Sequence, residues 1–257
     1  MGQVKILAIG NSFSQDATHY LYKLAKADGI DALVVNLYIG GCSIETHWHN
    51  IESDAKLYLY ERDGKSTNQY VSIKDALAQE DWDFVITQQA SSDSGIADTY
   101  YPYINQLFKY IKEKVPNAKR LLHQTWAYET GSKHDCFGRY HNNQKEMYQR
   151  LCEANTFAAG EVEAQIIPCG DVVQEARGKE PFIYEKGGKS LCRDGFHMTY
   201  VYGRYILAST WYEVLFRKNI LDNTYIPETV FAPGEEVDPY ALNVIKQSVH
   251  QIVGKVE

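Results

Sequence analysis

The feature that most restricts the fold is a short apolar segment near the start of the chain, followed at once by a polar turn. Residues 4–9 read VKILAI, an almost unbroken aliphatic and β-branched run. Such runs are typical of strands in parallel sheets, which helices cover on both faces. The run ends at Gly10, and a helical pattern follows it. We therefore expect Ser12 at the carboxyl end of a central strand, where open α/β sheets bind their ligands.

The rest of the chain repeats this alternation of strand and helix. The patterns predict further strands at residues 32–39, 83–87, 120–125 and 165–169, and helices at residues 17–27, 101–114, 144–158, 172–177, 200–216 and 239–253. Strands that alternate with helices favour a three-layer α/β fold, with a parallel sheet between two layers of helices. A chain of 257 residues is often one such domain, and we expect a single domain over residues 1–257.

One segment breaks the alternation. Residues 56–74 alternate polar and apolar side chains around Asp63 and Gly64, which is the pattern of a β-hairpin. We expect a hairpin insertion that either borders the cleft or forms a contact between subunits. The helix at residues 200–216 is apolar on almost all sides, which predicts that it is largely buried.

Ser12 has three interpretations. A serine between a strand and a helix is most often a helix cap, although Ser14 could take that role here. A phosphate-binding loop, as in flavodoxin, is a weaker match because GNSFS contains one glycine. The third interpretation is a nucleophile, which needs a base from elsewhere in the chain.

A candidate base lies near the other end of the chain, in the segment RDGFH. Asp194 and His197 are three residues apart in this loop. That spacing allows the carboxylate to turn back and accept the imidazole Nδ1–H, which leaves Nε2 to face a nucleophile. A serine, a histidine and an aspartate in these roles form a hydrolytic triad.

The two segments together resemble the SGNH, or GDSL-like, hydrolase superfamily, over roughly residues 4–217. GNSFS matches the family's first block, with Asn11 where aspartate is usual, and RDGFH matches its last block in full. The resemblance implies a flavodoxin-like fold and a catalytic triad of Ser12, Asp194 and His197. It also implies that Gly41, after the second strand, donates its backbone N–H to the oxyanion.

The third block departs from the family. After the strand at residues 83–87 the chain reads QQASS, and the asparagine that donates to the oxyanion in the family is missing. A glutamine amide could replace it, and we favour Gln89 over Gln88.

Other side chains near the expected cleft are candidates for binding. Trp126 and Tyr128 follow the strand at residues 120–125 and could stack on a sugar ring. Residues 131–143 are polar and contain glycine, and we expect them to form a mobile loop over the cleft. His47 and His49 with one carboxylate are a weak metal ligand set, so we expect them in a solvated loop or in the cleft wall.

Composition restricts partners and location. The formal charge of −7 comes without a basic run, which argues against a nucleic-acid partner. No stretch approaches the ~20 apolar residues of a membrane span. The sequence starts directly in its first strand, so we expect a cytoplasmic protein unless a leader has been removed. Five cysteines without a CxxC pair do not indicate a disulfide framework or a zinc site.

The combined interpretation is a serine hydrolase that acts on a short-acyl ester, with an O-acetyl ester of a carbohydrate as the expected substrate. It needs no metal and no organic cofactor. The expected partner is then a small-molecule or glycan ester substrate. The sequence leaves open whether the protein forms a homo-oligomer. Three alternatives remain: an acyltransferase with the same triad, a carbohydrate-binding protein that has lost the chemistry, and a flavodoxin-type nucleotide binder.

Overall fold

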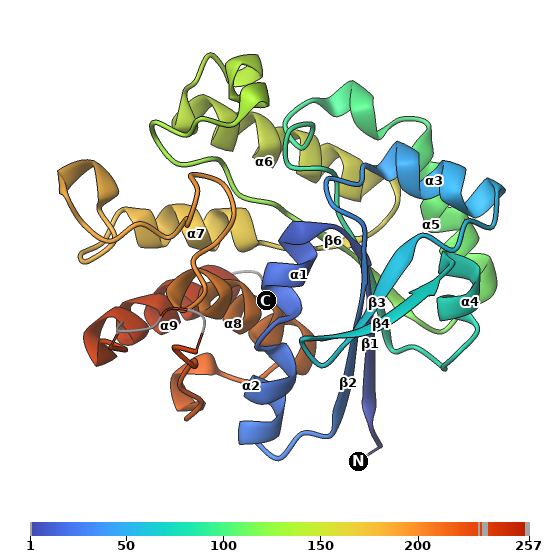
Figure 1. Ribbon diagram of the computed structural model, residues 1–257, viewed down its shortest axis with the longest axis horizontal. Coiled ribbons are helices and arrows are strands. Elements are labelled where there is room, and N and C mark those ends of the chain that lie inside the picture. The colour runs from blue at the N-terminus through green and yellow to red at the C-terminus, as the bar shows by residue number, and fades with distance from the viewer. Residues whose placement is uncertain (1, 231, 233–235, 255–257) are drawn as a thin grey trace.

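The alternation of strands and helices builds a three-layer fold, in which a seven-stranded sheet lies between two layers of helices (Figure 1). The computed structural model describes residues 2–230, 232 and 236–254. The strands are β1 (Val4–Gly10), β2 (Ala32–Tyr38), β3 (Tyr58–Arg62), β4 (Lys65–Val71), β5 (Phe84–Thr87), β6 (Lys119–His123) and β7 (Gln165–Ile167). The helices are α1 (Ser12–Thr18), α2 (Leu21–Ala27), α3 (Ile44–Glu52), α4 (Ile73–Leu77), α5 (Tyr103–Lys114), α6 (Gln144–Glu161), α7 (Cys169–Arg177), α8 (Tyr202–Phe216) and α9 (Pro239–Val253).

The order of the strands places β1 in the middle of the sheet. The order is β4-β3-β2-β1-β5-β6-β7, and β1, β2, β5, β6 and β7 run parallel. Without β3 and β4, this is the flavodoxin-like order 2-1-3-4-5, whose topological switch point lies between its first and third strands. The predicted fold class is therefore confirmed. Ser12 lies two residues after the end of β1, beside that switch point.

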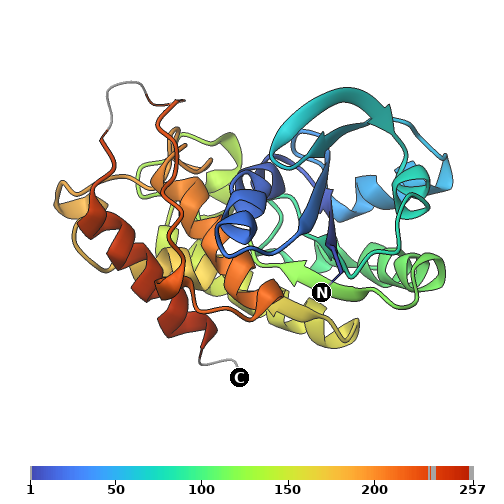
Figure 2. The same cartoon turned by 90° about the horizontal axis from the view of Figure 1, so that it is seen from below.

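The predicted hairpin is also confirmed. β3 and β4 pair antiparallel and extend the sheet beyond β2. Asp63 and Gly64 form the turn, with φ of 51° and 76°. Positive φ at both central residues is what a type I′ hairpin turn requires. The hairpin lies on the far side of the molecule from α9 in both views (Figures 1 and 2).

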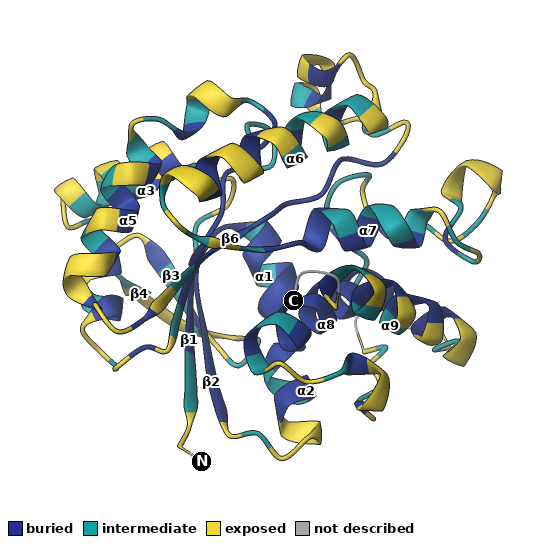
Figure 3. Cartoon of the chain, turned by 180° about the vertical axis from the view of Figure 1, so that it is seen from behind, coloured by how far each residue is buried: buried dark blue, intermediate teal, exposed yellow. Residues whose placement is uncertain are grey.

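Two apolar cores lie on the two faces of the sheet. Ile6 and Ala8 of β1 pack with α1, α2, α7, α8 and α9, whereas Leu7 and Ile9 pack with α3, α4 and α5. Successive side chains of a strand point to opposite faces, so an unbroken apolar strand supplies both cores. Helix α8 lies between α9 and α1 and is buried along almost its whole length, as predicted (Figure 3).

Two local predictions are wrong. The helix expected at residues 17–27 starts already at Ser12 and is interrupted after Thr18, so that α1 and α2 are separate. Tyr20, at this break, is fully buried, and its hydroxyl donates to the carbonyl of Tyr200, 2.8 Å away. The segment with His47 is not a loop, because Ser43 caps a helix there by accepting the N–H of Thr46.

Within the described residues, no helix has the length and apolar character needed to cross a membrane.

Candidate active site

Ser12 is the first residue of α1, and its hydroxyl is not used to cap the helix. The cap is Asn11, whose side-chain oxygen accepts the N–H of Phe13 at 3.0 Å. The hydroxyl of Ser14 accepts the N–H of Asn11 in return, at 3.1 Å. This reciprocal pair is a capping box. The helix-cap interpretation of Ser12 is therefore wrong, and the Ser12 hydroxyl remains available for another partner.

That partner is His197, from the loop before α8. The Nε2 atom of His197 lies 2.9 Å from the Ser12 hydroxyl oxygen, although the two residues are 185 positions apart. The Nδ1 atom lies 2.7 Å from a carboxylate oxygen of Asp194. The carboxylate fixes the hydrogen on Nδ1, so Nε2 is the atom that can accept the hydroxyl proton. The structure thus brings together the three side chains of the predicted triad.

The carboxylate of Asp194 stays ionised because of its local hydrogen bonds. One oxygen accepts the backbone N–H groups of His197 and Phe196, at 2.7 and 3.2 Å. Partial burial acts to raise the pKa of Asp194, but the hydrogen bonds from His197 and Phe196 outweigh it and lower the pKa below its usual value. Gly195 makes the tight turn with a φ of 87°, and a side chain there would meet Ser132.

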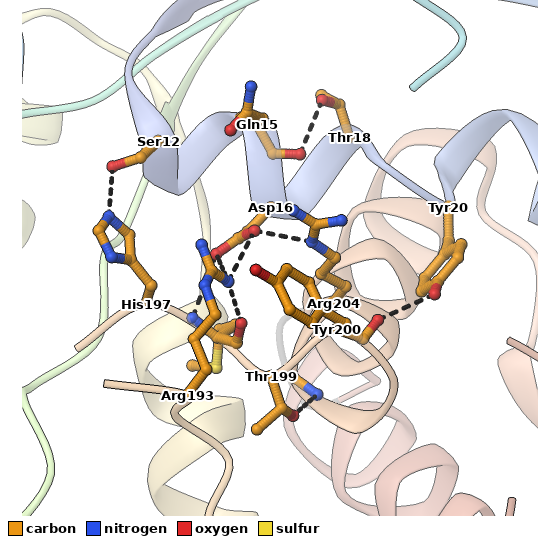
Figure 4. A network of polar contacts seen from close by, with 12 residues as sticks. Ser12, Gln15, Asp16, Thr18, Tyr20, Arg193, His197, Thr199, Tyr200 and Arg204 are labelled. Atoms are coloured by element: carbon orange, nitrogen blue, oxygen red, sulfur yellow. Dashed lines mark hydrogen bonds and ion pairs between the residues drawn. The ribbon is translucent and has the colours of Figure 1, made fainter. Parts of the chain in front are cut away.

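A buried carboxylate, that of Asp16, ties the loop with Asp194 and His197 to helix α1 (Figure 4). Asp16 lies one turn after Ser12 and is fully buried. It accepts from Arg193 Nη1 at 2.9 Å, from Arg204 Nε at 2.8 Å and from the backbone N–H of Met198 at 3.1 Å. Because Arg193 and Met198 flank the segment with Asp194 and His197, Asp16 holds both ends of that segment against α1.

Two backbone N–H groups beside Ser12 are suitable oxyanion donors. Gly41 follows β2 with a φ of 64° and lines the same cavity as Ser12. Within the described residues, neither the Ser12 nor the Gly41 N–H has an acceptor. Free donors that converge next to a nucleophile are what an oxyanion site needs.

The glutamines of the third block do not provide a further donor, so that prediction is wrong. The amide nitrogen of Gln89 donates to Thr99, and its oxygen accepts the N–H groups of Ile44 and Ala90. The amide nitrogen of Gln88 donates to the Asn11 side-chain oxygen at 2.7 Å. Both glutamines are buried, and neither lines the cavity. Their amides support the loops that carry Asn11 and Ala90 instead.

The cavity beside Ser12 has a volume of about 250 Å³. Its walls carry hydroxyls, aromatic rings and backbone amides but no Asp, Glu, Lys or Arg; they consist of Asn11, Ser12, Phe13, Tyr38, Gly40, Gly41, Ala90, Ser91, Ser92, His134, Phe196 and His197. The β3–β4 hairpin does not contribute to these walls, so it does not border the cleft. A larger hollow, of about 460 Å³, lies between Gln165 and Val253 and contains none of the triad residues.

Trp126 and Tyr128 are not substrate-binding residues, contrary to the prediction. Both are fully buried. The ring of Trp126 stacks on Phe13 at a centroid distance of 3.9 Å, and its Nε1–H donates to the carbonyl of Phe196. The hydroxyl of Tyr128 lies 2.9 Å from that of Ser91. The two rings support the cavity from behind, where a sugar cannot reach them.

The two histidines of α3 have structural environments. His47 is fully buried, with Nδ1 at 2.8 Å from the hydroxyl of Tyr58, so it is neither solvated nor part of the cleft wall. His49 is exposed and contacts Glu52 of the same helix. Among the described residues, no three His, Cys, Asp or Glu side chains are grouped as metal ligands.

Two residues of the site were missed by the sequence analysis. Asp16 follows Ser12 by four positions on the same face of α1, and that spacing was the available signal. Its partners are 177 to 188 positions away, so no local pattern identifies them. His134 lies in the polar segment that was expected over the cleft, where one histidine cannot be distinguished from another by sequence alone.

Comparisons with known proteins agree with this architecture. A family model described as "Domain of unknown function (DUF4886)" matches residues 5–243. A DUF4886 family protein from Bacteroides uniformis is 39% identical and superposes with a TM-score of 0.89, covering 98% of this chain and 95% of that chain. A search of curated proteins finds no match to the sequence.

More distant structures share the fold. A protein from Slackia heliotrinireducens, provisionally classed as an SGNH hydrolase, is 22% identical, with a TM-score of 0.56 over 82% of this chain and 98% of that chain. An acetylxylan esterase from Geobacillus stearothermophilus is 12% identical, with a TM-score of 0.51 over 88% of this chain and 97% of that chain. The fold is therefore that of the SGNH hydrolases.

Proposed function

We propose that this chain, which belongs to the DUF4886 family, is a serine esterase that hydrolyses a short-acyl ester, with an O-acetyl ester of a carbohydrate as its substrate class. One observation carries the proposal. Ser12, His197 and Asp194 are linked by contacts of 2.9 and 2.7 Å, and Ser12 and His197 line a cavity. The contacts follow the order of a hydrolytic triad.

The chemistry follows from this geometry in two stages. His197 Nε2 takes the Ser12 proton as the hydroxyl oxygen attacks the ester carbonyl, and Asp194 stabilises the imidazolium that forms. The same Nε2–H then protonates the departing alcohol, which leaves an acyl group on Ser12. In the second stage His197 takes a proton from water as the water oxygen attacks the acyl carbonyl. The bond between the acyl carbon and the Ser12 oxygen then breaks, His197 returns the proton to that oxygen, and the carboxylic acid leaves.

The negative charge on the carbonyl oxygen needs donors that are already in place. The Ser12 and Gly41 N–H groups are free and lie beside the nucleophile. They would bind the oxyanion without the side-chain donor of the third block, because both glutamines are buried outside the cavity and their amides donate to other groups. One oxyanion donor is typically worth about 10²–10³ in rate, so we expect a slower enzyme than one with three donors.

The cavity supports a small and uncharged substrate group. Its volume of about 250 Å³ is below the ~300–1,000 Å³ of ordinary ligand pockets. It therefore encloses a short acyl group and a small part of the alcohol. The lining has no Lys or Arg, which argues against a phosphate or carboxylate on the buried part of the substrate.

The occupied third block also favours a second candidate function, a carbohydrate-binding protein with little or no catalysis. The two candidates differ in the reactivity of Ser12. A binding protein needs no reactive hydroxyl, whereas an esterase forms a covalent bond to it.

The test is hydrolysis of p-nitrophenyl acetate and p-nitrophenyl decanoate by the purified protein. The esterase proposal predicts turnover of acetate in preference to decanoate, and loss of turnover together with loss of fluorophosphonate labelling in Ser12→Ala. Ser66→Ala is the matched control, because Ser66 lies in β4 and is exposed. Turnover that persists in Ser12→Ala would refute the assignment, and absence of turnover with intact binding of acetylated sugars would favour the second candidate.

A further inference from the structure

His134 is a polar residue of the cavity that the triad does not use. It lies in the segment after β6, is half-buried, and lines the cavity with Ser12. Its Nδ1 accepts the backbone N–H of Cys136 at 3.1 Å. A neutral imidazole has one acceptor nitrogen and one N–H, so this bond assigns the hydrogen to Nε2. Within the described residues, that Nε2–H has no hydrogen-bond partner.

Aromatic contacts hold the ring on the same side of the cavity as the base. The His134 ring lies 4.6 Å from the ring of Tyr128 and 4.6 Å from that of Phe196. Phe196 in turn lies 4.2 Å from the ring of His197. One ring therefore separates His134 from His197, and the Cys136 bond fixes its orientation.

The environment keeps His134 uncharged. Burial lowers its pKa; Asp135 and Asp194 act to raise it, and His197 acts to lower it. The net pKa lies below the usual value of a histidine. At neutral pH the side chain is therefore a hydrogen-bond donor without a charge, suited to a neutral acceptor oxygen.

The position of the leaving alcohol follows from the proposed reaction. His197 must protonate the departing oxygen, so the alcohol part of the ester lies on the His197 side of the cavity. We propose that His134 binds this alcohol part, its Nε2–H donating to an oxygen next to the ester, such as a neighbouring hydroxyl or ether oxygen of a sugar. This inference rests on the proposed esterase function and narrows its substrate class to esters whose alcohol carries a second oxygen next to the ester.

Two acetyl esters of similar size test the proposal: a monoacetylated methyl xyloside and cyclohexyl acetate, whose ring has no neighbouring oxygen. We expect the ratio of their kcat/KM values to favour the xyloside in the wild type and to fall about tenfold in His134→Phe, the usual weight of one neutral hydrogen bond. The loss should appear mainly as a higher KM for the xyloside. His134→Gln should restore part of the ratio because its amide can donate from a similar position. His49→Phe is the matched control, since His49 is exposed and outside the cavity.

An unchanged ratio in His134→Phe, or an equal loss for both esters, would overturn the proposal. A binding measurement separates this failure from failure of the esterase function. In the Ser12→Ala background, His134→Phe should weaken binding of the acetylated xyloside about tenfold by calorimetry. If wild type hydrolyses neither ester, the esterase function fails, whereas an unchanged Kd in this background refutes the role of His134 itself.

Discussion

Asp16→Asn should lower both the stability of the protein and its kcat, although it leaves Ser12, His197 and Asp194 unchanged. The substitution keeps the size of the side chain and removes the charge that two arginines share. Asp16 is fully buried, and the Arg193 and Arg204 side chains are 22% and 10% exposed. Removing one partner of a buried ion pair costs about 3–5 kcal/mol, and the partial exposure of Arg193 favours the lower value.

A loss of about 3 kcal/mol in the free energy of unfolding corresponds to a large fall in Tm. Chains of this size lose roughly 2–4 °C in Tm per kcal/mol, so we expect the Tm to fall by about 6–12 °C. We also expect kcat to fall by about 10²-fold at a temperature well below the new Tm, because the loop with His197 loses its attachment to α1. Thermal unfolding by circular dichroism and hydrolysis of p-nitrophenyl acetate measure the two effects.

Asp194→Asn is the matched control, the same chemical change in the base loop. The Asp194 side chain is 40% exposed, so we expect a Tm within about 2 °C of wild type. Its kcat should nevertheless fall by about 10³–10⁴, because the imidazole loses the group that fixes its tautomer. A Tm of Asp16→Asn within 2 °C of wild type would refute the burial argument. A lower Tm with unchanged kcat would refute the claim that Asp16 positions His197.

Three further predictions concern the triad, the third block and pH. Ser12→Ala and His197→Ala should each remove most of kcat and the double variant little more, and a loss equal to the product of the single losses would refute a shared mechanism. Gln89→Ala should lower the Tm, because it leaves two backbone N–H groups unpaired at about 1–3 kcal/mol each. It should change kcat by less than tenfold, and a loss of about 10²-fold in kcat with unchanged Tm would restore the oxyanion role. His123 is fully buried, and burial lowers its pKa to about 3. As the pH falls from 7.5 to 5.5, His123 takes up a proton in the unfolded chain but not in the folded one. The free energy of unfolding should therefore fall by about 1.4 kcal/mol over this range. Urea titrations at both pH values should show that the free energy of unfolding changes by about 1.4 kcal/mol less in His123→Asn than in wild type. An equal change in the two proteins would contradict the claim that His123 stays neutral in the folded state.

Local patterns in the sequence were sufficient for the architecture. The apolar run of β1 identifies a strand covered on both faces, because a strand that supplies two cores can place few polar residues on either face. The Asp63-Gly64 turn identifies the hairpin because few residues adopt positive φ readily. The sequence also pointed to Ser12, Asp194 and His197, through a strand end, a spacing of three residues within one loop and the resemblance to the SGNH hydrolases, and the structure places their side chains in contact.

The tertiary structure decided which of the other side chains near the strand ends face the cavity and which are buried behind it. One glutamine amide, that of Gln89 in preference to Gln88, was expected to reach the oxyanion, but the two amides donate to Thr99 and Asn11, which other segments supply. Trp126 was expected in the cleft, and its ring is stacked under Phe13 instead. The carboxylate of Asp16 acquires its role from groups that only folding brings near it. Sequence pattern reports the periodicity of burial along one element, whereas these contacts depend on the packing of several elements, and that packing is determined only when the whole chain folds.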